Sequence, residues 1–178
     1  GEKCKIHFSL GTILDEDKNL LNVFFGEPCT VMKTAVPIVR QIFGVTVPKA
    51  YDLVIASPGG HPKDINLYQA QKGLTHAARI TRDKGWVILL AACPEDSGSQ
   101  GFEEYMASAK SHKKIIQQFK EGIFEVGPHK AYQIACEAVR VKIILVSQID
   151  PKKVKSWMLT RSKPDLFQPL LTLIIEQR

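Results

Sequence analysis

Three short apolar runs, separated by segments of helical periodicity, constrain the fold of this 178-residue chain more than any other feature. The runs cover residues 51–57, 86–92 and 142–148, and each is typical of a strand buried on both faces of a sheet. Between and after them the spacing predicts helices near 64–82, 101–109, 112–121, 129–139, 152–161 and 165–176. Strands that alternate with helices form parallel sheets with right-handed crossovers. The sequence therefore predicts an α/β fold, a Rossmann-like three-layer domain with a mainly parallel sheet.

The start of the chain has a different pattern. Segments 5–14 and 20–26 carry alternating or short apolar runs on either side of a polar turn, which predicts a β-hairpin. The next segment has helical spacing, and Pro37 inside it should kink or split that helix because proline lacks a backbone donor. We therefore expect a small hairpin-plus-helix unit at 1–48 and the α/β domain at 49–178.

Composition and charge are those of an ordinary globular protein, with 44% hydrophobic and 24% charged residues. No apolar run approaches the length that spans a bilayer, and the opening residues lack a signal-peptide core, so no membrane partner is expected. The net charge of +6 raises the question of nucleic acid. The basic residues are dispersed, however, and no nucleic-acid-binding motif accompanies them, so no nucleic-acid partner is expected either.

The cysteines give no sign of a metal site or a disulfide framework. Cys4, Cys29, Cys93 and Cys136 are far apart and show none of the Cys/His spacings that are typical of metal ligands. We expect reduced thiols in a cytoplasmic protein. Because the first residue is Gly and not Met, we also expect either an expression-tag remnant or a domain excised from a longer protein.

The stretch from Asp52 to Ala78 carries the strongest functional signal. Ser57-Pro58-Gly59-Gly60 follows the first apolar run and is typical of a sharp turn. Asp64 is the expected N-cap of the next helix, because its carboxylate can accept from the amides of the first turn. The side chains expected to face the sheet are Leu67, Ala70, Gln71 and Leu74.

Gln69, Lys72 and His76 fall on a different face of this predicted helix. A helix that starts at the carboxyl end of a parallel strand offers its first turns to the crevice where open α/β sheets bind ligands. A neutral amide and an ammonium at that place, next to Tyr68, suit a small carboxylate or hydroxy acid. On pattern alone a Gln and a Lys at this spacing are more often simply exposed to solvent.

Gly59 and Gly60 leave two interpretations open. Their amides can face a phosphate or carboxylate, or the glycines serve an ordinary tight turn at positive φ. The string is not G-x-G-x-x-G, and no acidic residue ends the second strand, so a plain dinucleotide site is not expected. His61 lies in the same loop, and His129 with Tyr132 begins a later helix. Neither histidine is expected to be a catalytic base.

A family resemblance rests on a motif in this stretch. The residues are Ser57, Gly59, Gly60, Pro62, Asp64, Tyr68, Gln69 and Lys72, in the string S-x-G-G-x-P-x-D-x-x-x-Y-Q-x-x-K. The string resembles one in the C-terminal domain of the lactate racemase family, the nickel-pincer nucleotide-dependent racemases and epimerases of 2-hydroxy acids. The likeness extends to ILDEDKNLLNVFFGEP, to GWVILLAAC with GFEEY, and to GPHKAYQIACEAVRVKIILVS, and so covers most of the chain.

The resemblance implies roles for particular residues. Gln69 and Lys72 would bind the substrate, and the site would be lined by Tyr68, Gly59, Gly60, His61, His129 and Tyr132. The implied activity is inversion of a 2-hydroxy acid by hydride transfer to and from the cofactor, nickel pyridinium-3,5-bisthiocarboxylic acid mononucleotide. This isomerase activity would belong to the full-length protein.

The resemblance also implies a partner domain that the sequence lacks. In this family the proton-exchanging histidines, the cofactor-bearing lysine and the nickel-ligating histidine belong to an N-terminal domain, against which residues 1–48 would pack. None of the five histidines here is therefore expected to take those roles. The chain alone is expected to bind neither nickel nor cofactor, and to be inactive.

Two other classes of function stay open at this point. One is a non-catalytic nucleotide- or anion-binding α/β module that uses Gly59 and Gly60. The other is an interaction domain whose Lys-rich helices, around Lys152 and Lys153, dock a partner.

Overall fold

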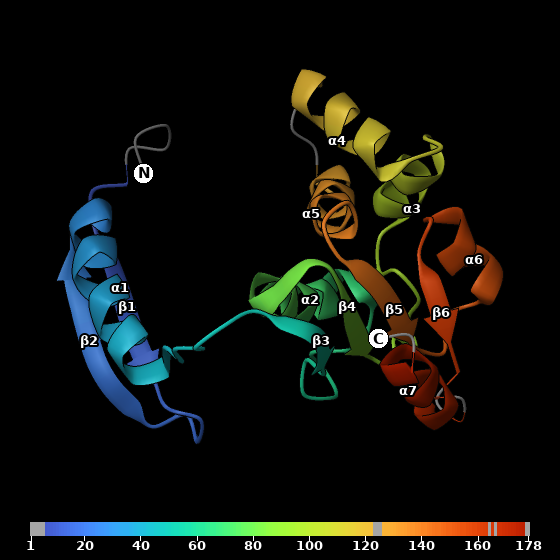
Figure 1. The fold of residues 1–178 in the computed structure, drawn as a ribbon. Coiled ribbons are helices and arrows are strands. Elements are labelled where there is room, and N and C mark those ends of the chain that lie inside the picture. Colours follow the sequence, from blue (N-terminus) through green and yellow to red (C-terminus); the bar gives the residue numbers. More distant parts are fainter. Residues whose placement is uncertain (1–5, 123–125, 164, 166, 177–178) are drawn as a thin grey trace. The chain divides into compact units, whose positions relative to one another are not determined.

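The computed structural model describes residues 6–122, 126–163, 165 and 167–176. The chain divides into two compact units, Gly1–Pro48 and Lys49–Arg178 (Figure 1). The first contains an antiparallel hairpin and one helix, and the second contains a parallel sheet with its helices.

In the first unit, strand β1 (Ser9–Leu14) pairs with the antiparallel strand β2 (Leu20–Gly26), and helix α1 spans Pro28–Phe43. The predicted hairpin is confirmed from residue 9 onward, while its predicted start at residue 5 lies outside the described residues. Glu27 caps α1, since its carboxylate accepts from the backbone N–H groups of Cys29 and Thr30 at 2.9 and 2.8 Å. These hydrogen bonds lower the pKa of Glu27 to about 2.

Of the two outcomes expected at Pro37, a split is not observed, because α1 is one helix. Pro37 is exposed. Lys33, one turn earlier, has the carbonyl that loses its helical partner, and this residue is exposed as well. Water can therefore satisfy that carbonyl, and the helix continues through the proline.

The first unit buries few apolar side chains. Among its described residues only Ile13 and Val31 are buried, with 5% and 8% of their surface exposed. The hairpin register places Leu10 opposite Phe25, and both are exposed. The ring of Phe8 lies 6.1 Å from that of Phe25. One face of the hairpin is therefore apolar and is not covered by the described residues of its own unit.

The second unit is built on a four-stranded parallel sheet. Its order is β3 (Tyr51–Ala56), β4 (Thr81–Leu90), β5 (Lys142–Val146) and β6 (Thr160–Ser162). The three predicted apolar strands correspond to β3, β4 and β5. Val87 and Ile88 face opposite sides of β4 and are both fully buried. The predicted α/β fold with its mainly parallel sheet is confirmed.

Strand β6 is absent from the sequence prediction, which places a helix over 152–161. Helix α6 (Pro151–Ser156) ends early, and Met158 then adopts a φ of 59°, outside the right-handed helical region. The chain leaves this turn extended and pairs with β5. Periodicity does not identify β6, because a three-residue edge strand contains no apolar run.

Helices cover both faces of the sheet. The connecting helices are α2 (Leu67–Ile80), α3 (Gln100–Ala107), α4 (His112–Glu121), α5 (Pro128–Ala138) and α6, and α7 (Phe167–Glu176) follows β6. The larger core joins Leu89 of the sheet to side chains of α2, α3, α5 and α6, including the buried Leu74 of α2. A smaller core joins Ile88 and Ile144 to Ile174 of α7, so α7 lies on the opposite face. The fold thus has three layers.

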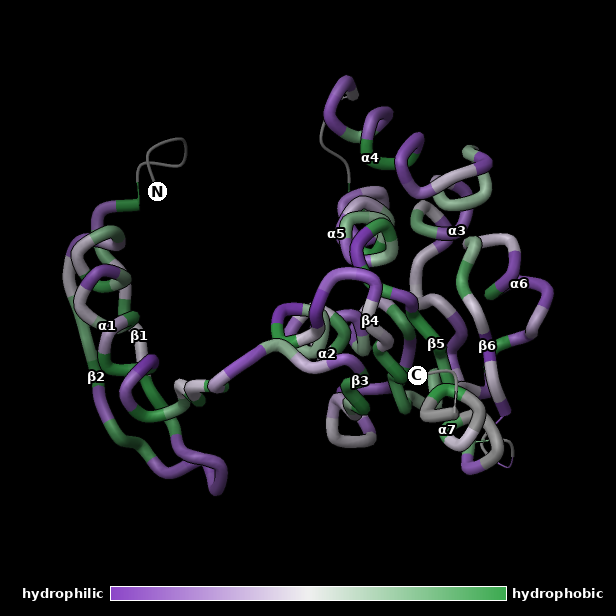
Figure 2. Tube along the Cα trace, in the orientation of Figure 1, coloured by the Kyte–Doolittle hydropathy of each residue, from purple (hydrophilic) through white to green (hydrophobic). Residues whose placement is uncertain are grey.

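The energetic centre of this unit is the buried sheet. Figure 2 shows hydrophobic strands at its middle and a largely hydrophilic α4 at its outside. Each fully buried Leu, Ile or Val side chain contributes about 1.5–3 kcal/mol relative to the exposed residue.

In the described part of the chain, no helix is both long enough and apolar enough to cross a bilayer.

The parallel strands β3, β4 and β5 end at the same edge of the sheet. The loops 57–66, 91–99 and 147–150 therefore meet there, at the side where open α/β sheets bind ligands.

Candidate functional site

Helix α2 begins later than predicted because Asn66, and not Asp64, caps it. The Asn66 side chain accepts from the backbone N–H of Gln69 at 3.1 Å. Asp64 lies in the preceding turn and ties the loop to the end of β4. Its Oδ2 accepts from the N–H of Ala92 at 3.1 Å, and its carbonyl oxygen accepts from Cys93 at 2.9 Å. The predicted N-cap is therefore wrong, although the carboxylate does bind backbone N–H.

The first backbone amides of α2 are used inside the protein. Leu67 donates to the carbonyl of Asp96 at 2.9 Å, and Tyr68 donates to that of Ser97 at 3.0 Å. With the Gln69 N–H capped by Asn66, the start of this helix presents no open amides to an anion. The glycine loop lies before it, with Gly59 and Gly60 at φ of +97° and +72°. The observed geometry is that of a tight turn.

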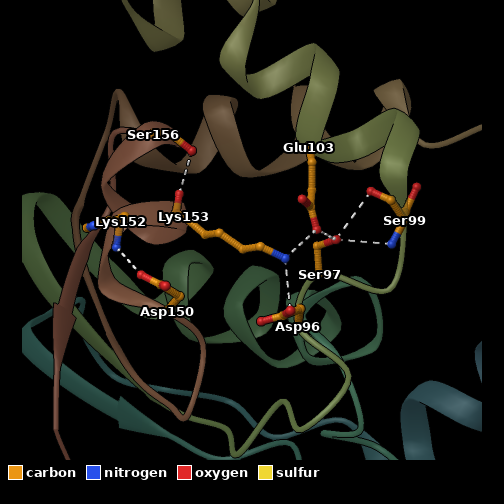
Figure 3. A network of polar contacts seen from close by, with 8 residues as sticks. All are labelled: Asp96, Ser97, Ser99, Glu103, Asp150, Lys152, Lys153 and Ser156. Atoms are coloured by element: carbon orange, nitrogen blue, oxygen red, sulfur yellow. Dashed lines mark hydrogen bonds and ion pairs between the residues drawn. The ribbon is translucent and has the colours of Figure 1, made fainter.

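A polar network holds the loop that caps α2 (Figure 3). Lys153 of α6 reaches Asp96 Oδ2 at 2.9 Å and Glu103 Oε1 at 3.7 Å. Ser97, which is buried with 1% of its surface exposed, donates to Glu103 at 2.5 Å. Glu103 of α3 therefore ties this loop to α6 through Lys153. Lys153 is engaged within the fold, and the hydrogen bond with Asp96 is the main reason that its pKa is raised.

Gln69 and Lys72 lie together on α2, as their spacing predicts. The Lys72 ammonium donates to Gln69 Oε1 at 2.7 Å. Lys72 is exposed and Gln69 is half-buried. This bond uses one Lys72 hydrogen and the Gln69 oxygen. The other ammonium hydrogens and the Gln69 amide hydrogens, which have no further partner among the described residues, can donate to oxygens of a ligand.

Tyr68 and His129 form a second polar pair between α2 and α5. Tyr68 Oη lies 3.4 Å from His129 Nε2, and the two rings meet edge-on at 82°. His129 Nδ1 accepts from the N–H of Gly127 at 3.2 Å. In the neutral ring Nε2 therefore carries the hydrogen and donates to Tyr68. This arrangement leaves the Tyr68 hydroxyl hydrogen for another acceptor.

A cavity of about 300 Å³ lies between α2 and α5. It is lined by Gln71, Lys72, Thr75, His76, Arg79, Lys130, Tyr132, Gln133, Cys136 and Glu137. Of the candidate site residues proposed from the sequence, Lys72 and Tyr132 line it, together with His76 from the same face of α2. Tyr132 also stacks on Phe119, with ring centroids 4.5 Å apart. Gly59, Gly60, His61, Gln69 and His129 are not among its lining residues, and His61 is exposed in its loop.

Lys130 is the residue that sequence reasoning missed. Only 8% of its surface is exposed, its ammonium donates to Gln71 Oε1 at 2.8 Å, and it lies 5.2 Å from the centre of the Tyr68 ring. Burial lowers the pKa of Lys130, and the charge of Lys72 lowers it further. The available signal was its place beside His129 in GPHKAY, but no spacing predicts that a lysine is buried.

Metal-ligand side chains do not cluster in the described part of the chain. Within the ranges that the structure describes, no three His, Cys, Asp or Glu side chains come close enough to hold a metal ion. The described residues therefore do not fit a nickel centre.

Comparison with known proteins identifies the family. The family model of the lactate racemase C-terminal domain matches residues 46–165. The chain belongs to the lactate racemase family. The resemblance carried by the motif from Ser57 to Lys72 is thereby confirmed.

Two curated relatives of this family are similar to the chain. Lactate racemase of Lactiplantibacillus plantarum is 31% identical over 115 residues, which cover 65% of this chain and 27% of the relative. Lactate racemase of Thermoanaerobacterium thermosaccharolyticum is 29% identical over 168 residues, covering 91% of this chain and 39% of the relative. The chain thus spans well under half the length of either relative.

A solved structure supports the fold. The lactate racemase apoprotein from Thermoanaerobacterium thermosaccharolyticum matches with a TM-score of 0.76 and 24% identity, over 91% of this chain and 40% of that one. At this identity the match bears on the fold alone.

Proposed function

We propose that this chain is the substrate-orienting part of a longer racemase or epimerase that acts on a 2-hydroxy acid. Gln69 and Lys72 bind the carboxylate and hydroxyl oxygens of the substrate, and Tyr68 with His129 borders the site. The observation that carries the proposal is the hydrogen-bonded Gln69–Lys72 pair at the start of α2, within the family motif.

The chemistry of the pair suits this role. An ammonium and an amide, already joined at 2.7 Å, direct several hydrogens to one place. A charge-assisted hydrogen bond to a carboxylate contributes about 1.5–3 kcal/mol, so Lys72 dominates the binding of the acid group. The bond from Lys72 also holds the Gln69 side chain in a fixed orientation, which reduces the entropy lost when the substrate binds.

In this proposal the cofactor is bound by a part of the full-length protein outside this chain. The described residues offer no cluster of metal ligands, so we assign a nickel-pincer nucleotide to protein outside this chain. When bound there, that group would supply the hydride chemistry that a 2-hydroxy acid needs, because its α-hydrogen is only weakly acidic. The residues of this chain bind and orient the acid.

Assay of the full-length protein, loaded with cofactor, against a panel of 2-hydroxy acids tests the function. We expect Lys72→Ala to lower kcat/KM by about 10- to 100-fold, the equivalent of one charge-assisted hydrogen bond. Gln69→Glu should act in the same direction, because a carboxylate beside Lys72 would neutralise the ammonium and repel the substrate.

Lys113→Ala is the matched control, since Lys113 is exposed on α4 and has no described partner. It should leave kcat/KM within about twofold of the parent value, as surface substitutions usually do. Absence of turnover for every acid in the panel would refute the proposal. Equal losses in Lys72→Ala and Lys113→Ala would refute the role of Lys72.

The two other functions remain predictions, and the structure bears on each only in part. For the nucleotide- or anion-binding module, the Gly59 amide donates to Ser57 and the first amides of α2 are bound by Asp96, Ser97 and Asn66, which reduces the number of amides left for an anion. The docking surface relied on Lys152 and Lys153, and the latter is held by Asp96 and Glu103.

A further inference from the structure

The cavity between α2 and α5 gathers positive charge without matching negative charge. Lys72, Arg79 and Lys130 line it, and Glu137 is its one acidic lining residue. The Glu137 carboxylate lies 3.8 Å from Arg140, which stands outside the cavity lining, and it also interacts with Arg79 beyond ion-pair distance, so one negative charge is shared between two guanidinium groups. In the described part of the chain no carboxylate lies within ion-pair distance of Lys72, Arg79 or Lys130.

Lys130 places part of this positive charge in a mostly buried position. Its side chain is largely buried, and its single described hydrogen-bond acceptor is the neutral Gln71 oxygen at 2.8 Å. An ammonium has three hydrogens, so two are left without a described protein acceptor. A buried charge that lacks an ionic partner is costly. The Tyr68 ring, 5.2 Å from the ammonium, offsets part of that cost, and a bound anion would offset more of it.

The neighbouring donors point to an oxygen-rich ligand. Gln71 accepts from Lys130 through Oε1 and donates through Nε2 to Thr75 Oγ1 at 2.6 Å. The Thr75 hydroxyl therefore accepts from Gln71 and keeps its own hydrogen for a further acceptor. Thr75 lines the cavity, one turn before Arg79 on the same helix. Besides Lys72, two cations and a hydroxyl donor thus border one space of about 300 Å³.

We propose that the cavity between α2 and α5 is an oxyanion-binding site in which Lys130 and Arg79 are the charged ligands and Thr75 donates a hydrogen bond. The ligand is a carboxylate or phosphate group. It has two possible sources: a second acidic group on the substrate held at Gln69 and Lys72, or a free inorganic anion. The site does not depend on the racemase assignment, because its residues bind an anion whether or not the protein inverts a hydroxy acid.

Titration of the isotope-labelled protein with inorganic phosphate at constant ionic strength, followed by amide NMR, tests the site. We expect saturable shifts in segments 71–79 and 128–137. Lys130→Met and Arg79→Gln should each raise the Kd for phosphate about tenfold, the effect of one lost charge-assisted contact. Lys113→Met removes a charge outside the cavity and should leave the Kd unchanged.

Shifts that grow linearly without saturation would overturn the proposal, as would a Kd that neither substitution in the cavity alters. Lys130→Met removes a buried side chain and can disturb folding. Arg79 is exposed, so Arg79→Gln keeps the fold and decides the question if the other variant fails to fold.

Competition then identifies the source of the anion. Lactate and 2-hydroxysuccinate are added separately to the phosphate-saturated protein. Displacement by 2-hydroxysuccinate but not by lactate supports the site and names the substrate's second carboxylate as its ligand. Retention of phosphate with both acids supports the site and names a free inorganic anion. Displacement by lactate as effective as that by 2-hydroxysuccinate would overturn the proposal, because phosphate would then occupy only the Gln69–Lys72 pair.

Discussion

At the scale of single residues, the start of α2 depends on the close packing of Gly98 against Asn66. Gly98 has a φ of +73°, and a Cβ added there would overlap the Asn66 side chain. That side chain is the N-cap of α2, so the glycine leaves room for the cap that positions Gln69. Gly60 has nearly the same φ, +72°, but a Cβ there would meet nothing within 4 Å. Substitutions at these two glycines therefore distinguish the cost of backbone strain, which both share, from the cost of steric overlap, which only Gly98 has.

We expect Gly98→Ala to destabilise the protein more than Gly60→Ala. Both place an L-residue in the left-handed region, at about 1–2 kcal/mol. Only Gly98→Ala also displaces the N-cap, which adds about 1 kcal/mol. Urea unfolding followed by circular dichroism measures the difference. Equal losses in the free energy of unfolding of the two variants would contradict this expectation, because Asn66 would then have moved without uncapping the helix.

At the scale of elements, α4 is anchored to the end of α6 through one histidine. His112 Nε2 lies 3.1 Å from the carbonyl oxygen of Trp157, so Nε2 carries the hydrogen and donates it. Burial lowers the pKa of His112, and the hydrogen bond to Trp157 only partly opposes that shift. Trp157 itself is fully buried and packs edge-on against Phe102, with centroids 5.2 Å apart. The histidine thus links a surface helix to the core.

This contact predicts a pH dependence of stability. The folded protein favours neutral His112, so the stabilisation is complete above the unfolded pKa of about 6.5 and is lost as the pH falls below it. Urea midpoints at pH 7.5 and 5.5 should differ more for the parent protein than for His112→Gln.

His76→Gln serves as the control for this pH effect, because His76 is exposed on α2. It should keep the parental pH dependence. A pH dependence that survives in His112→Gln would assign the effect to other groups.

At the scale of the whole molecule, the two units differ in how much core each possesses. Two buried side chains, Ile13 and Val31, are found among the described residues of the first unit. The second unit has a large continuous core on one face of its sheet and a smaller one on the other. A unit of this size with so small a core has little stability of its own. We infer that the first unit is completed by other protein, in keeping with the proposal of a longer racemase.

Hydrogen exchange measures this difference. We expect amides in residues 9–43 of this chain to exchange much faster than those of β4 and β5, because local opening exposes little apolar surface in the first unit. Comparison with the full-length protein provides the control, in which the same amides should become protected. Equal protection of both units in the isolated chain would contradict the inference.

Local pattern was sufficient for most of the architecture. The apolar runs at β3, β4 and β5 and the helical spacing of α2 to α5 were identified from the sequence, because burial on both faces or along one helical stripe imposes a short repeat. Prediction from local pattern failed at β6, because a three-residue strand is too short to show a repeat. At Asp64 it failed because several residues near a helix start can cap it, and the turn geometry selects among them.

The sequence by itself determined the family motif, the alternation of strands and helices, and the placement of Gln69 beside Lys72, since each depends on neighbours within a few residues. Only the tertiary structure decided that Lys130 is buried against Gln71, 59 positions away along the chain. The tertiary structure likewise decided that the loop after β4 accepts hydrogen bonds from the first backbone amides of α2. Contacts between distant segments are set by how whole elements pack, and the burial that results changes the charge and hydrogen bonding of residues whose local pattern is unremarkable.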